Sequence, residues 1–92
     1  MAYTVLRTKA GNAFLRDHRP LSPTERVTLT AHLLDDLRDD GDHLRQAGVR
    51  IGPDHFWYEV AIGDKPRVFR FAVTDAFAAF GVLLVVFGEE IT

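Results

Sequence analysis

The stretch FWYEVAIGDKPRVFRF, residues 56–71, decides the fold of this chain. Both of its ends are rich in aromatic and β-branched residues, a composition typical of β-strands. Gly63 and Pro66 lie between them and favour a tight turn, because glycine permits positive φ and proline fixes φ. We therefore predict a β-hairpin with strands at residues 56–62 and 67–73.

The two faces of this hairpin are predicted to differ. With Ile62 and Arg67 flanking the turn, Glu59 lies directly opposite Arg70. One face is then apolar enough to pack against helices and holds Phe56, Tyr58, Val60, Ile62, Phe69, Phe71 and Val73. The other face carries Trp57, Glu59, Ala61, Val68, Arg70 and Ala72. An opposed acid–base pair contributes only about 0.2–1 kcal/mol, so the Glu59–Arg70 pair can be a register-fixing pair or a functional one.

The rest of the chain supplies two helices and two further strands. We predict a strand at residues 2–7 and a helix at residues 8–18, with its apolar side at Ala10, Ala13, Phe14 and Leu15. Ser22, Pro23 and Glu25 form a capping box that begins a second helix, which is expected to stop at Gly41. Its apolar stripe is assigned to Val27, Ala31, Leu33, Leu34 and Leu37.

Residues 42–54 read as a polar loop, and residues 82–87 as a last strand that is apolar on both faces and therefore central. A length of 92 residues fits one domain, residues 1–92. The predicted fold class is α+β: a single-layer antiparallel sheet, in the order strand-helix-helix-strand-strand-strand, with both helices on one face.

Composition excludes several kinds of function. The chain has no cysteine, which removes disulfides and thiolate chemistry. Its four histidines show no zinc-like spacing, so neither a metal nor a cofactor is expected. The first residues are too polar for a signal peptide and no apolar run could span a bilayer, which predicts a cytoplasmic protein without a membrane partner. A net charge of −2 is not typical of a nucleic-acid binder.

Only one polar cluster could support chemistry on RNA. Such chemistry needs proton transfer at a 2′-hydroxyl and a cation on the phosphate. His55 could transfer protons and Arg70 could bind the phosphate, with Arg50 and Arg67 close by in the sequence. Solvation of a loop histidine is the more common alternative for His55.

The order of elements and the segment FWYEVAIGDKPRVFRFAV resemble the bacterial RelE/ParE toxin superfamily, in particular its HigB-like, phage-associated branch. Trp57, Tyr58 and Glu59 match its Trp-Glu strand, residues 67–71 match its Arg-containing strand, and residues 82–88 match its last strand. The resemblance implies a ribosome-dependent mRNA endonuclease that a small antitoxin neutralises. It implies catalytic roles for Arg70, His55 and Glu59, and RNA contacts by Arg50, Trp57 and Arg67.

This sequence departs from the superfamily pattern at three positions. Ala61 replaces an arginine, and Glu89 and Glu90 replace a lysine pair. We therefore expect an mRNA interferase, weakened by these changes, with a cognate antitoxin and ribosome-bound mRNA as partners. The alternatives are a protein-binding module on the same fold and a ParE-like inhibitor of DNA gyrase. The sequence leaves the oligomeric state open.

Overall fold

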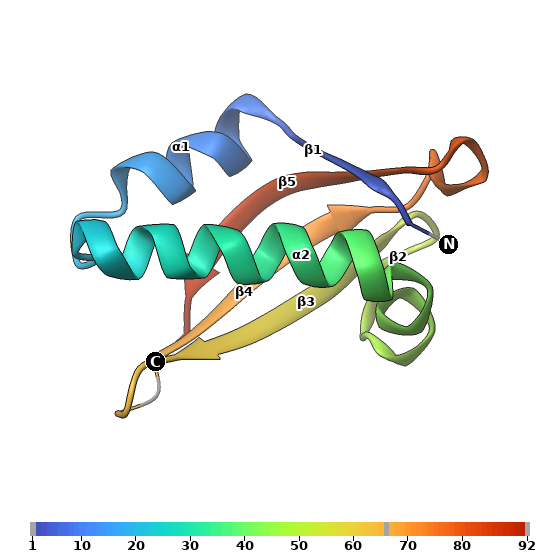
Figure 1. Cartoon of the computed structure of the whole chain (residues 1–92). Helices are drawn as coiled ribbons and strands as arrows, with labels where there is room; N and C mark the ends of the chain where they lie inside the picture. The colour runs from blue at the N-terminus through green and yellow to red at the C-terminus, as the bar shows by residue number, and fades with distance from the viewer. Residues whose placement is uncertain (1, 66, 92) are drawn as a thin grey trace.

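The computed structural model describes residues 2–65 and 67–91 of the chain. Its elements follow the order β1 (Thr4–Arg7), α1 (Lys9–Asp17), α2 (Pro23–Ala47), β2 (Arg50–Gly52), β3 (His55–Ile62), β4 (Arg67–Thr74), a 3-10 turn (Ala78–Phe80) and β5 (Val82–Glu90). The five strands form one sheet in the order β1-β5-β4-β3-β2. Figure 1 shows α1 and α2 together in front of the sheet, so the other face has no helix over it. The α+β class is confirmed.

The hairpin of β3 and β4 has the predicted register. Glu59 is the partner of Arg70, and Ile62 is the partner of Arg67. Gly63 in the turn adopts φ 88°, the positive region that glycine tolerates best. The expected turn proline, Pro66, lies outside the described residues. The predicted core face is also correct, since Phe56, Phe69, Phe71 and Val73 are fully buried.

The sheet is mixed rather than antiparallel, which corrects the prediction. β1 pairs with β5 in parallel, Val5 opposite Leu83, while β4 pairs with β5 antiparallel. β5 is therefore an interior strand, as its two apolar faces indicated. It is also longer than predicted and continues to Glu90. A register shift lies between Ala72 and Val73, so that Val86 is the extra residue of a β-bulge.

The second helix does not stop at Gly41. The capping box at Ser22 is present, and α2 continues to Ala47 across a kink at Asp40, whose φ and ψ are −123° and 19°. Gly41 is buried, and Tyr3 packs so closely on it that a Cβ there would lie 2.6 Å from the Tyr3 ring. The expected loop at residues 42–54 is thus the last turns of α2 followed by β2.

The apolar sides of both helices were placed partly wrongly. Leu29, Leu33 and Leu37 of α2 are fully buried, whereas Val27 is 71% exposed. In α1, Gly11 and Leu15 face the core, and Ala10 is exposed. Gly11 packs so closely that a Cβ there would lie 2.6 Å from the carbonyl oxygen of Val85. A glycine thus takes the buried position that the alanine pattern suggested for Ala10.

Candidate functional site

The candidate site is the sheet face that α1 and α2 leave uncovered, here called the helix-free face. Two neighbouring rows cross three strands on this face. The first row is Trp57 on β3, Ala72 on β4 and Phe87 on β5. The second row is Glu59, Arg70 and Glu89 on the same three strands. An aromatic row therefore lies beside a row that alternates acid, base and acid.

The aromatic row closes over Ala72. The rings of Trp57 and Phe87 meet edge to face, with centroids 5.7 Å apart and planes at 88°. Such a pair adds about 0.5–1.5 kcal/mol to the gain from buried area. Ala72 beneath it is only 1% exposed, although the helices cover the opposite face. Phe87 itself is 40% exposed, so the row keeps an aromatic surface open to solvent.

Arg70 is held from two sides. Its guanidinium carbon lies 4.3 Å from the centre of the Trp57 ring, in cation–π geometry. Its Nε donates a hydrogen bond to Glu89, and the two side chains form an ion pair. The register opposes Arg70 to Glu59, as predicted, but the guanidinium pairs with Glu89 on the other neighbouring strand. Glu59 is exposed.

His55 lies on the same face but away from Arg70. It begins β3 and pairs with Thr74, whereas Arg70 pairs with Glu59. Four residues of strand separate His55 from Glu59, which corresponds to about 13 Å. The structure therefore brings Trp57, Glu59 and Arg70 together and leaves His55 two rows away.

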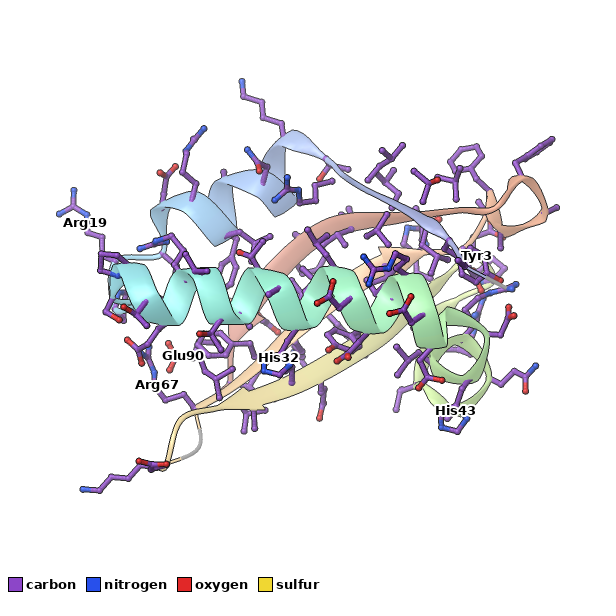
Figure 2. The ribbon with its side chains drawn as sticks, in the orientation of Figure 1. Tyr3, Arg19, His32, His43, Arg67 and Glu90 are labelled. Atoms are coloured by element: carbon purple, nitrogen blue, oxygen red, sulfur yellow. The ribbon has the colours of Figure 1, made fainter. Side chains whose placement is uncertain are left out.

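Arg67 belongs to the other face of the sheet. Its Nη2 and Nε donate to the two carboxylate oxygens of Glu90 at 2.7 and 2.9 Å, and its Nη1 donates to the carbonyl of Pro20 at 3.0 Å. Figure 2 shows Arg67 and Glu90 next to each other below the first turns of α2. Arg67 joins the sheet to the helical layer, and does not face a ligand on the helix-free face.

Glu90 is the most strongly perturbed acid in this contact. The hydrogen bonds from Arg67 lower the pKa of Glu90 to about 2, and His18 adds to the effect. His18 Nε2 lies 2.8 Å from Glu90 Oε1 and its ring stacks on Phe14. Glu90 therefore connects β5 to both α1 and β4.

Arg50 is also engaged in an ion pair. It donates to both oxygens of Asp75, at 2.7 and 3.1 Å, and to the carbonyl of Pro53. Asp75 receives a third hydrogen bond from Arg45 at 3.1 Å. The bonds from Arg50, followed by those from Arg45, lower the pKa of Asp75. This cluster ties α2 and β2 to the connection that leads into β5.

The charge on the helix-free face is negative. In the row of Glu59, Arg70 and Glu89, two carboxylates and one guanidinium leave a net charge of −1. Glu89 neutralises Arg70, and Glu90 on the other face neutralises Arg67. An incoming phosphate would therefore meet the negative charge of Glu89 beside Arg70.

A second concave region lies on the helical side. A groove of about 470 Å³ has Leu15, Val27 and Ala31 among its apolar lining, with Arg7, Arg16 and Arg26 also around it. A separate pocket between β1 and α2 has Val5, Leu34 and Arg38 in its lining. β1 is an edge strand, so its outer side has no strand beside it among the described residues. We call the groove lined by Leu15, Val27 and Ala31 the helix trough.

Two kinds of site are missing from residues 2–65 and 67–91. They contain no group of three or more His, Cys, Asp or Glu side chains placed to hold a metal ion. None of the helices in this part of the chain has the length and apolar character needed to cross a membrane.

Comparison with known proteins adds no assignment, because no protein family, curated protein or solved structure matches the chain.

Sequence reasoning placed Trp57, Glu59 and Arg70 on one face but missed Phe87 and Glu89 as their neighbours. The signal was present in the alternation of β5, since Phe87 and Glu89 are two residues apart. Because the strand was predicted to end at residue 87, Glu89 was not placed on the sheet.

Proposed function

We propose that this protein is a toxin-like component related to the RelE/ParE superfamily, and that it acts by binding a protein target through the helix-free face. The resemblance of residues 56–73, the order of the elements and the two helices on one face of the sheet support the superfamily. The helix-free face offers a half-exposed aromatic surface beside polar residues. Such surfaces commonly mark protein interaction sites.

The observation that carries protein binding over RNA cleavage is the ion pair of Arg70 with Glu89. A nuclease site needs uncompensated cations where the phosphate charge develops. Here Arg70 lies between two glutamates, and Arg50 and Arg67 are bound to Asp75 and Glu90. His55 lies about 13 Å along β3 from Glu59, the register partner of Arg70, so His55 and Arg70 are not placed to act on the same phosphate group. Of the three expected catalytic residues, Glu59 and Arg70 lie side by side, whereas His55 lies two rows away.

RNA cleavage remains the second candidate, on one specific observation. Trp57 and Arg70 are stacked at 4.3 Å on an accessible face. Proteins that bind single-stranded nucleic acid combine aromatic platforms with cations in the same way. Release of Arg70 from Glu89 would give this pair a free cation beside a stacking surface.

An antitoxin partner would fit the helix trough. The apolar residues Val27 and Ala31 are exposed there, and Arg7, Arg16 and Arg26 lie around them. An acidic segment with apolar side chains would complement both features. This assignment leaves the helix-free face for the target, so that the two partners occupy opposite sides of the sheet.

Expression in bacteria tests this proposal. The wild-type protein, Trp57→Ala and the control Phe80→Ala are induced without any partner, and growth and mRNA integrity are followed in the same cultures. Phe80 is a suitable control because it is 82% exposed and lies in the turn before β5, outside both rows. We expect the wild type and Phe80→Ala to inhibit growth with intact mRNA, and Trp57→Ala to be inert.

Each other outcome has a clear meaning. Growth inhibition with cleaved mRNA would show that the protein acts as an mRNA interferase and not by binding a protein target. No inhibition by the wild type would remove the toxin proposal. Inhibition by Trp57→Ala equal to that of the wild type would show that the helix-free face is not the acting surface.

A further inference from the structure

We infer that the helix-free face binds a basic segment of its protein partner, with Glu59 as the acid that receives an arginine or lysine side chain. This inference rests on the proposed function and names the chemistry of the target. It follows from three observations: the order of charges in one row, the aromatic row beside it, and the exposure of Glu59.

The charge row is built to accept one more cation. Arg70 lies between Glu59 and Glu89 in the register, and its ion pair is with Glu89. Glu59 is the exposed acid of the row, on the strand that borders short β2. A cationic side chain bound at Glu59 would complete an alternation of base, acid, base and acid across the sheet. Opposite charges placed side by side across strands stabilise such rows.

The aromatic row supplies the second half of the recognition. Trp57 is half-buried and precedes Glu59 by two positions along β3, on the same face. Its ring already holds the guanidinium of Arg70, and Phe87 presents a 40% exposed ring beside it. Aromatic faces attract arginine and lysine, and they also cover the aliphatic stems of these side chains. A segment that alternates basic and aliphatic residues matches both rows.

Other occupants fit less well. A nucleic acid would bring phosphates to a row with a net charge of −1, and an acidic peptide would meet the same repulsion. A second copy of this chain would place Glu59 and Glu89 against an identical row, and like charges in contact are destabilising. The basic segment is the occupant whose charge complements the face.

Fluorescence of Trp57 measures this binding directly, because it is the single tryptophan of the chain. The full protein is titrated at low salt with a short peptide of alternating arginine and leucine. The same peptide with glutamate in place of arginine, and single-stranded poly(U), are titrated in parallel. We expect a saturable change of Trp57 emission with the basic peptide only, and weakening by salt.

A matched pair of variants separates site binding from general charge attraction. Glu59→Lys and Asp39→Lys change the net charge equally, but Asp39 lies on α2. We expect Glu59→Lys to lower the affinity for the basic peptide at least about tenfold, and Asp39→Lys to change this affinity less than about twofold. Thermal melts check that both variants are folded.

Three results would overturn the inference: equal weakening by both variants, a response to poly(U) that exceeds the response to the basic peptide, or no response to the basic peptide at all. These results differ from a failure of the proposed function, which is read from growth. Growth inhibition that needs Trp57, without binding of the basic peptide, would leave the toxin-like activity and reject only the basic target.

Discussion

The guanidinium of Arg70 lies 4.3 Å from the centre of the Trp57 ring and is paired with Glu89 on the neighbouring strand. Both contacts are made on the sheet face without helices. Together they fix a cation in place and neutralise it. Arg70, which the sequence suggests as a phosphate ligand, is therefore already paired with Trp57 and Glu89. The exposed charge beside it is the carboxylate of Glu59.

Release of Arg70 should change what this face binds. In Glu89→Gln the guanidinium loses its ion pair and the row of Glu59, Arg70 and residue 89 becomes neutral. We expect little effect on folding, within about 1 kcal/mol, because the pair is substantially exposed. Titration by Trp57 fluorescence should show weaker binding of the basic peptide and tighter binding of poly(U) than in the wild type. An unchanged preference would show that Glu89 does not control the charge of the face.

The core face of the hairpin should tolerate little change. Phe71 is fully buried, and its ring contacts Phe14 edge to face at 5.7 Å. We expect Phe71→Ala to lower the free energy of unfolding by about 3–5 kcal/mol, enough to unfold much of so small a domain. Urea denaturation measures this loss. Phe80→Ala is the control, since an 82% exposed ring should contribute less than about 0.5 kcal/mol.

Local patterns predicted the hairpin but not the sheet around it. The register of β3 and β4 follows from a short turn and an alternating pattern, both contained in residues 56–73. The parallel pairing of β1 with β5 joins distant segments, and no local signal specifies it. Gly41 was misread as a helix stop, because its function is close packing against Tyr3, which only the tertiary structure reveals.

The candidate site was predicted to a similar extent. Alternation alone placed Trp57, Glu59 and Arg70 on one face. The same alternation puts Arg67 on the face of Phe69, so its expected RNA contact conflicted with the predicted register. The pairing of Arg70 with Glu89 depends on the bulge at Val86, and a one-residue shift there would move every later side chain to the other face.

Gly88 allows Phe71 to pack, and an added methyl group should disturb it. A Cβ at Gly88 would lie 2.5 Å from two atoms of the Phe71 ring. We expect Gly88→Ala to lower the free energy of unfolding by about 1–3 kcal/mol through overpacking. Gly52→Ala is the matched control, because nothing lies within 4 Å of a Cβ there. If both variants melt at the wild-type temperature, the packing of β5 against β4 is looser than described.

Low pH should destabilise the fold by protonating Glu90, whose contacts with Arg67 and His18 hold the sheet to the helical layer. Its pKa is lowered from 4.5 to about 2, mainly by hydrogen bonds from Arg67. A carboxylate with a depressed pKa stabilises the fold above its ordinary pKa, and this contribution is lost as the pH falls from about 4.5 towards 2. We expect Glu90→Gln to cost on the order of 2 kcal/mol at neutral pH.

The pH dependence separates Glu90 from the other acids. Asp75 also has a lowered pKa, so the wild type loses stability in acid for more than one reason. The difference in free energy of unfolding between wild type and Glu90→Gln should therefore shrink as the pH approaches 2. A difference that stays constant from pH 7 to pH 2 would show that the ion pair with Arg67 is not the source of the effect.

Cleavage of mRNA on translating ribosomes tests the central claim most directly. The purified wild-type protein and Arg70→Ala are added to a reconstituted translation reaction, and the 5′ ends of the mRNA are mapped by primer extension. A protein that binds its target through a neutralised Arg70 should leave the mRNA intact in both reactions. Cleavage by the wild type that Arg70→Ala abolishes, with an unchanged melting temperature, would contradict this account and identify Arg70 as a catalytic residue of an mRNA interferase.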